Sequence, residues 1–262
     1  MKKTGFTLIE LLVVIAIIAL LMGILMPALQ KVREQAKGIH CVSNVRSLAM
    51  AWFMYQDDND GRLVNGNVPR SIKFKEYKQS YWVEPPQDIE GTYTGDPSPT
   101  LADELRGIER GYLYSYIKDV DVYRCPSDDR KRNPNRATFR SFSIAGGMNG
   151  ELGSQAVKKY VEINNPSTKY VFVEEADPRK WNMGSWIVNP TGDKWIDPLT
   201  AWHEGKTTLG WADGSAEMHK WQDPRTVEMY DVYVEGGWSP EHPGSMDLKF
   251  MQRGYQLRYT AQ

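Results

Sequence analysis

The sequence predicts an α+β protein in which one long N-terminal helix packs on a small antiparallel β-sheet domain. Three observations support this class: an apolar stretch at residues 6–26, helical spacing of apolar residues beyond it, and short alternating runs in the second half of the chain. We expect the helix to cover residues 6–57 and a soluble domain to cover residues 58–262. A length of 262 residues is compatible with one domain on a helical stem.

Residues 6–26 form the first half of the predicted helix and contain one ionisable side chain, Glu10. A helix of this length is about 31 Å long, which matches the hydrocarbon thickness of a bilayer. Lys2 and Lys3 precede the stretch, so the positive-inside preference places the N-terminus in the cytoplasm and the domain outside. The run is longer than the apolar core of a secretory signal, and we expect it to be kept as a transmembrane segment.

Glu10 is the residue that hydropathy does not explain, because a carboxylate in hydrocarbon costs roughly 2.5–3.5 kcal/mol on insertion scales. Cleavage between Gly5 and Phe6 would create an α-amino cation one helical turn before Glu10. The two charges can then pair within a chain or between neighbouring chains. The alternative is a plain signal anchor with a chance glutamate.

Residues 2–10, KKTGFTLIE, resemble the type III signal sequence of type IV pilins and type II secretion pseudopilins. The resemblance implies that a prepilin peptidase removes residues 1–5 after Gly5, that Phe6 is N-methylated, and that Glu10 contacts the Phe6 amine of an adjacent subunit. It also implies a pilin-like fold with a helix kink at Pro27. The implied partners are other pilin or pseudopilin subunits, the prepilin peptidase and methylase, an inner-membrane assembly platform and membrane lipid.

Beyond Pro27 the helix is predicted to become amphipathic, with a polar face opposite an apolar one. The apolar positions recur at steps of three and four residues and are Val32, Ala36, Ile39, Val42, Val45, Ala49, Trp52 and Phe53. Residues 57–61, DDNDG, are predicted to end the helix. A calcium loop is the less favoured interpretation, because the EF-hand pattern lacks its first Asp and its bidentate Glu. Some major pseudopilins bind calcium elsewhere, but we assign no metal ligand and no cofactor.

The domain is predicted to be a small sheet with few helices. Residues 62–100 are expected to be irregular, residues 101–118 helical, and residues 124–128 a turn. Strands are expected at 141–144 and 169–174, where β-branched and aromatic residues concentrate. Residues 207–221 predict a hairpin whose two-residue type I′ turn is Asp213-Gly214, with Leu209 opposite Met218 on the apolar face.

His203, nine further residues and Asp213-Gly214 are similar to the H-X9-DG element of a pseudopilin-like family. With residues 41–46, 55–61 and 124–128, this element extends the resemblance over most of the chain, except residues 62–100 and 222–262. The family's naming associates the element with processing. We favour a structural role, in which a hydrogen-bonding histidine accompanies a hairpin turn.

Cys41 and Cys125 are the two cysteines of the chain, and they form neither a CxxC pair nor a zinc set. An extracytoplasmic compartment permits a disulfide between them that would tie the sheet to the helix. Such a bond would contribute roughly 4–5 kcal/mol in the chain-entropy model. The equal alternative is two separate thiols.

Composition and motifs argue against an enzyme or a nucleic-acid-binding protein. The net charge is −1, so no global field attracts nucleic acid. The four histidines form no obvious catalytic constellation, and the Glu174-Glu175 pair beside a strand is expected to be solvated. We therefore expect no catalytic residue.

The resemblance implies a non-catalytic subunit of a type II secretion pseudopilus, single-pass in the bacterial inner membrane with its domain in the periplasm or at the cell surface. The alternative is a type IV pilin-like surface filament subunit or a glycan-binding adhesin. The 9 Trp and 14 Tyr residues bear on this choice. Coplanar exposed Trp side chains would favour binding, and buried ones would favour a plain filament subunit.

Overall fold

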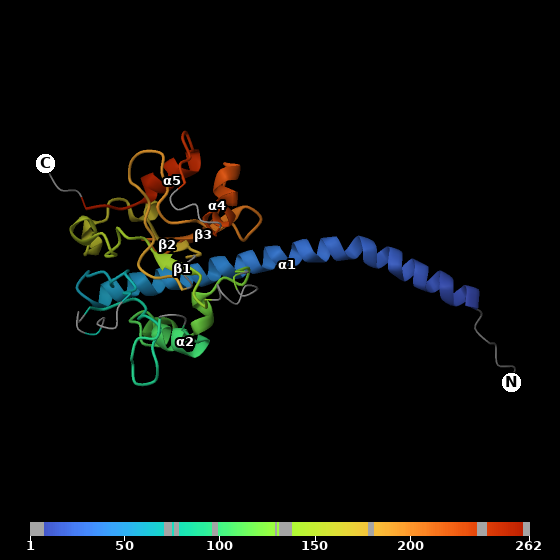
Figure 1. The fold of residues 1–262 in the computed structure, drawn as a ribbon, viewed down its shortest axis with the longest axis horizontal. Coiled ribbons are helices and arrows are strands. Elements are labelled where there is room, and N and C mark those ends of the chain that lie inside the picture. Colours follow the sequence, from blue (N-terminus) through green and yellow to red (C-terminus); the bar gives the residue numbers. More distant parts are fainter. Residues whose placement is uncertain are drawn as a thin grey trace.

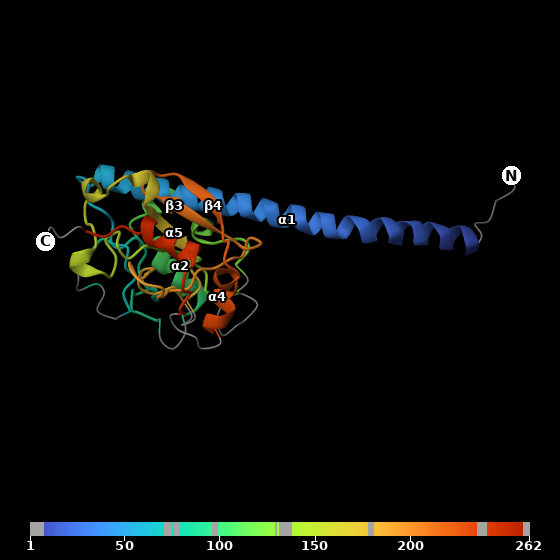
Figure 2. The ribbon, with the colours of Figure 1, turned by 90° about the horizontal axis from the view of Figure 1, so that it is seen from above.

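The computed structural model describes residues 8–70, 75, 79–95, 99–128, 130, 138–177, 181–234 and 240–258. Its main elements are one long helix, α1 (Leu8–Asp58), and a four-stranded antiparallel sheet against which the second half of α1 lies (Figure 1). The first half of α1 projects away from the domain in both views (Figure 2). The predicted α+β class is therefore confirmed, and the architecture is that of pilin-like proteins.

Helix α1 has 51 residues and continues through Pro27. Proline removes a backbone N–H and presses on the carbonyl four residues earlier, here that of Gly23. Figure 1 shows that the projecting half of α1 is curved. The predicted helix end is confirmed, because α1 stops at Asp58 and is followed by the left-handed residues Asp60 (φ 54°) and Gly61 (φ 71°).

The buried face of α1 begins at Gly38 and includes Val45, Ala49 and Trp52, as predicted. Three other predicted positions are wrong: Ala36 is exposed, and Val32 and Ile39 are 59% and 74% exposed. Val32 precedes the part of α1 that the domain covers, and Ile39 lies at its margin beside an open cavity. Helical periodicity alone does not show where along a helix its partner begins.

The sheet is a meander in the order β1-β2-β3-β4. Its strands are β1 (Phe142–Ile144), β2 (Tyr170–Glu174), β3 (Lys206–Trp211) and β4 (Ala216–Lys220). The first two coincide with predicted strands. Gly210 of β3 faces α1 so closely that a Cβ there would lie 2.8 Å from Val45 Cγ1, so the missing side chain permits close packing of helix and strand.

The predicted register of the β3–β4 hairpin is wrong by one residue. Leu209 pairs with Glu217, and Thr208 pairs with Met218. Only Gly214 (φ 85°) of the predicted Asp213-Gly214 turn is left-handed, whereas a type I′ turn needs positive φ at both positions. The Trp211 N–H donates to the Ser215 carbonyl, so the loop has one more residue than predicted. Asp213 stabilises it by accepting from the Ser215 N–H and hydroxyl.

The sheet is covered on both faces. Helix α1 packs on one face, while α5 (Met246–Gly254) packs on the other, where the rings of Phe250 and Trp211 are 6.4 Å apart. The Tyr170 hydroxyl, on β2, donates to the Met251 carbonyl at 2.9 Å. This two-sided burial explains why every residue of β2 is buried.

The predicted helix at residues 101–118 is two helices, α2 (Leu101–Glu109) and α3 (Tyr114–Ile117). The break occurs because the Tyr112 N–H donates to the Tyr81 carbonyl instead of to its own helix. Gly111 packs directly on the backbone of Trp82, where no Cβ would fit. Tertiary contacts thus interrupt the apolar periodicity.

The remaining helices are short. Helix α4 (Pro224–Val234) follows the hairpin. The 3-10 helices are η2 (Val120–Tyr123), η4 (Gly153–Gln155), η5 (Tyr160–Glu162) and η6 (Pro166–Thr168). The described parts of residues 62–100 form isolated bridges and turns, in agreement with the predicted irregular segment.

Candidate functional site

The exposed first half of α1 is the first candidate site. Residues 8–33 are all exposed, including large apolar side chains such as Leu8 at 78% and Ile24 at 68%. By length and composition, α1 can cross a membrane. An apolar surface this large requires lipid or protein around it.

Of the residues predicted for processing and assembly at the N-terminus, the structure describes Glu10. Glu10 lies in the first turn of α1, on its exposed part. Gly5 and Phe6 lie outside the described residues. The processing site therefore stays a prediction from the sequence.

The second candidate site is a buried cluster of four side chains where α1 meets the sheet: Cys41, Cys125, Glu174 and His203. None of the four is more than 4% exposed. Cys41 Sγ lies 2.7 Å from Glu174 Oε1, and His203 Nε2 lies 3.2 Å from both Cys125 Sγ and Glu174 Oε1. The four ligand-type atoms all lie within 4.8 Å of one another.

Each side chain of the cluster comes from a different part of the chain. Cys41 is on the buried face of α1, and Glu174 ends β2. Cys125 begins the predicted turn, which the Asp128 N–H closes by donating to the Cys125 carbonyl. The Cys125 N–H donates to Ser141 Oγ at 3.0 Å, which fixes this turn beside the sheet.

The carboxylate of Glu174 is oriented by two hydroxyl groups of β3. Thr208 Oγ1 donates to Glu174 Oε1 and Thr207 Oγ1 donates to Oε2, each at 2.9 Å. Glu174 and Glu175 are 0% and 1% exposed, so the prediction that this pair is solvated is wrong. The burial follows from the cover on both faces of the sheet.

His203 and Glu174 each shift the pKa of the other towards its charged form. Burial alone would lower the pKa of His203, but hydrogen bonds to Cys125 and Glu174 outweigh it and raise that pKa to about 10. Burial raises the pKa of Glu174, but the hydrogen bond and charge of His203 outweigh this and lower it below its usual value. Burial, with the neighbouring Cys125 and Glu174, raises the pKa of the Cys41 thiol.

His203 is hydrogen-bonded, as predicted, but its partners do not belong to the hairpin turn. Its Nε2 contacts Cys125 and Glu174. His203 precedes β3 in the chain, whereas Asp213-Gly214 follows that strand. At the turn, Gly214 packs on α1, where a Cβ would lie 2.7 Å from Met50 Sδ. The two ends of the H-X9-DG element therefore lie at the two ends of β3, and both face α1.

Cys41 and Cys125 are free thiols in this structure, and their sulfur atoms belong to the same cluster. The sequence predicted no metal ligand and no such grouping, because successive members of the cluster are 29 to 84 residues apart and form no short motif. A usable signal was the coincidence of both cysteines and His203 with the segments that carry the family resemblance.

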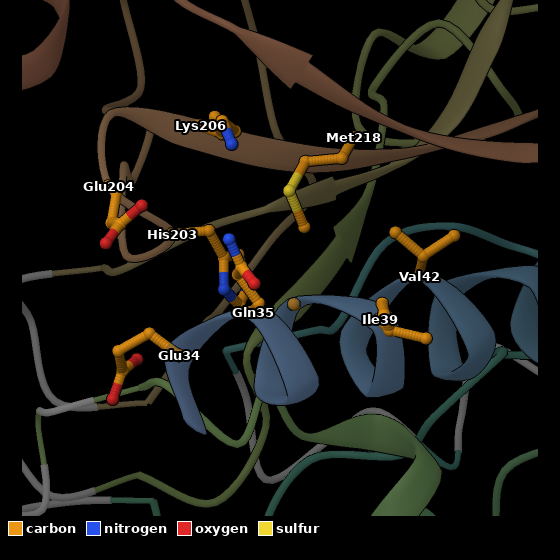
Figure 3. A pocket seen from close by; sticks show the side chains of 9 residues that line it. Glu34, Gln35, Ile39, Val42, His203, Glu204, Lys206 and Met218 are labelled. Carbon is orange, nitrogen blue, oxygen red and sulfur yellow. The ribbon is translucent and has the colours of Figure 1, made fainter. Parts of the chain in front are cut away.

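A cavity of about 420 Å³ opens beside the cluster, between α1 and the β3–β4 hairpin (Figure 3). His203 lines it together with Gly38 and Met218. Its other ring nitrogen, Nδ1, is buried and forms no hydrogen bond within the described part of the chain. Of the four cluster residues, His203 is the one that lines this cavity.

Comparison with known proteins adds one finding at the N-terminus. The model of a family described as the prokaryotic N-terminal methylation motif matches residues 1–26. No curated protein and no solved structure matches the chain. The motif and the fold together indicate a type IV pilin-like filament subunit, a generally non-enzymatic class. This class is anchored by its N-terminal helix, assembles with other pilin subunits and is processed by a prepilin peptidase.

Proposed function

We propose that this chain is a non-catalytic subunit of a type II secretion pseudopilus. It would be held in the inner membrane by residues 6–26, with residues 58–262 in the periplasm. The observation that supports this most is the exposed apolar half of α1, which carries the methylation motif at its start. Packing of these helices against one another would build the filament and remove their apolar surface from water.

Glu10 would guide assembly. Cleavage after Gly5 leaves a cationic amine on Phe6, and N-methylation keeps that amine basic. A carboxylate in an apolar helix bundle is costly unless it is paired, so the best position for Glu10 is beside the Phe6 amine of an adjacent subunit. Pro27 would let the exposed half of α1 bend during packing.

The tryptophan side chains favour a plain filament subunit over a glycan-binding adhesin. Seven of the eight described Trp residues are buried, and Trp202 is half-buried. Their rings pack inside the domain, as in the stacked pair Trp82 and Tyr123, whose centroids are 6.0 Å apart. The described surface therefore offers no platform of coplanar exposed Trp.

Replacement of Glu10 by Val tests the proposal. We expect normal membrane insertion and an unchanged fold, but at least about tenfold fewer subunits in filaments, because an unpaired amine remains in the apolar bundle. Crosslinked filament ladders and release of secreted proteins into the medium should fall together. Glu34→Val, on the same helix beyond the apolar stretch, is the matched control.

Normal incorporation of the Glu10→Val subunit would contradict the assembly mechanism. Loss of surface filaments without any change in protein secretion would instead identify a type IV pilus subunit.

A further inference from the structure

We propose that Cys41, Cys125, Glu174 and His203 form a structural zinc site that fixes α1 to the sheet. The inference does not depend on which filament the chain builds. It rests on the chemistry of the four side chains, on their geometry and on the residues that surround them.

The donor set suits zinc. Thiolate and imidazole ligands select Zn²⁺ among the common divalent ions, and structural sites in proteins are four-coordinate with Cys, His and occasional carboxylate ligands. Here two sulfur atoms, one imidazole nitrogen and one carboxylate oxygen converge from four segments. All four groups are buried, so no position is left open for a substrate, and the site is of the closed, structural kind.

Two separations within the cluster are close to those of a tetrahedral zinc site, and a third has to change. Bonds of about 2.3 Å to sulfur and about 2.0–2.1 Å to nitrogen and oxygen place tetrahedral ligand atoms roughly 3.3–3.8 Å apart. The His203 Nε2 atom already lies 3.2 Å from both Cys125 Sγ and Glu174 Oε1. The 2.7 Å separation of Cys41 Sγ and Glu174 Oε1 has to widen, which a rotation of the Cys41 side chain can supply.

Neighbouring hydroxyl groups supply the second layer that metal sites need. Thr208 and Thr207 each donate to one oxygen of Glu174, which leaves Oε1 directed at Cys41 and His203. Such outer hydrogen bonds orient ligands and raise metal affinity.

The position of the site explains its purpose. Cys41 lies on the stem helix, whereas Cys125, Glu174 and His203 belong to the domain. A zinc ion would therefore connect the stem helix directly to the domain. A buried ion pair with two thiols, or a Cys41–Cys125 disulfide, is the competing description of the same atoms.

Metal analysis of the full-length protein in detergent micelles tests the proposal. The protein is stripped with a chelator under reducing conditions, loaded with zinc sulfate, and freed of excess metal. We expect about one zinc ion per chain and a melting temperature that rises with zinc concentration. Loading with cobalt instead should give the charge-transfer absorption of a cobalt–thiolate bond.

Cys125→Ser and His203→Gln should each weaken zinc binding by at least about tenfold and remove the melting shift. Cys125→Ser should also weaken the cobalt–thiolate absorption. His40→Gln is the matched control, because His40 neighbours Cys41 in sequence but is exposed, and this variant should bind like the wild type.

Three results would overturn the zinc site. The first is that reduced wild-type protein binds neither zinc nor cobalt. The second is that protein isolated from its host contains a Cys41–Cys125 disulfide and no metal. The third is that both cluster variants keep their full zinc content. The first two need only the wild-type chain, so the test holds even where a variant fails to fold.

Discussion

The two halves of α1 belong to one continuous helix but meet opposite surroundings. Residues 8–33 are exposed on every side, although nearly all of residues 8–26 are apolar. From Gly38 onward, one face is buried against the sheet, and the other is exposed and carries both polar and apolar side chains. No described part of the domain covers the first half, whereas the second half contributes to the core of the domain.

The second half of α1 is therefore stabilised by folding of the single chain, and the first half only by lipid or by other subunits. Trp52 and Val45 contribute to the folding of one chain, because they are buried within it. Leu12 and Ile24 can contribute only where lipid or another subunit covers them. Substitutions in the two halves should therefore affect different measurements.

The largest expected effect on folding comes from Trp52→Ala. Trp52 is fully buried and packs near Tyr160, with ring centroids 6.1 Å apart. Its removal should lower the free energy of unfolding by about 3–5 kcal/mol, because it leaves a cavity between helix and domain. Urea unfolding in detergent, followed by tryptophan fluorescence and circular dichroism, measures the loss.

Leu12→Ala is the control in the exposed half. It should change the unfolding of the isolated subunit by less than about 0.5 kcal/mol, because no described part of the domain covers it. Equal losses for Leu12→Ala and Trp52→Ala would remove the distinction between the two halves.

A smaller effect, of opposite sign in the two halves, is expected from adding one methyl group to a glycine. Gly210→Ala should cost about 1–3 kcal/mol, since its Cβ would press on Val45 and Phe172. Gly23→Ala should stabilise the helix of the isolated subunit by up to about 1 kcal/mol, because nothing lies within 4 Å of that Cβ. Thermal unfolding and helix content measure both, and stabilisation by Gly210→Ala would contradict the close packing of β3 on α1.

Much of the fold was predictable from local patterns. The 51-residue helix, its end at Asp58 and the strands β1 and β2 follow from hydropathy, turn residues and β-branched runs. The errors arise where distant segments intervene. The Tyr81 carbonyl accepts from the Tyr112 N–H, and this interrupts a helix that the sequence predicted to be continuous. Asp213 does not adopt the positive φ of a type I′ turn, and the hairpin loop is one residue longer than predicted.

The two candidate sites differ in the same way. Glu10 is conspicuous because one charge in an apolar run violates hydropathy, and the motif around it is contiguous. The cysteine cluster forms only where α1, β2 and the segments beside them come together in the fold, and no short sequence motif predicts it. The sequence suggested a Cys41–Cys125 disulfide, and it offered His203 and Glu174 as separate features. Only the tertiary structure brings these two side chains together with the cysteines.

Photo-crosslinking in assembled filaments is the most direct test of the central claim, which is that the exposed half of α1 is buried between subunits. A photoreactive amino acid replaces Leu12 in one protein and the exposed Val161 of the domain in another. Our account predicts subunit–subunit crosslinks through the α1 helices from position 12 and far fewer from position 161. Crosslinks from position 12 to lipid alone, in filaments that have assembled normally, would contradict it.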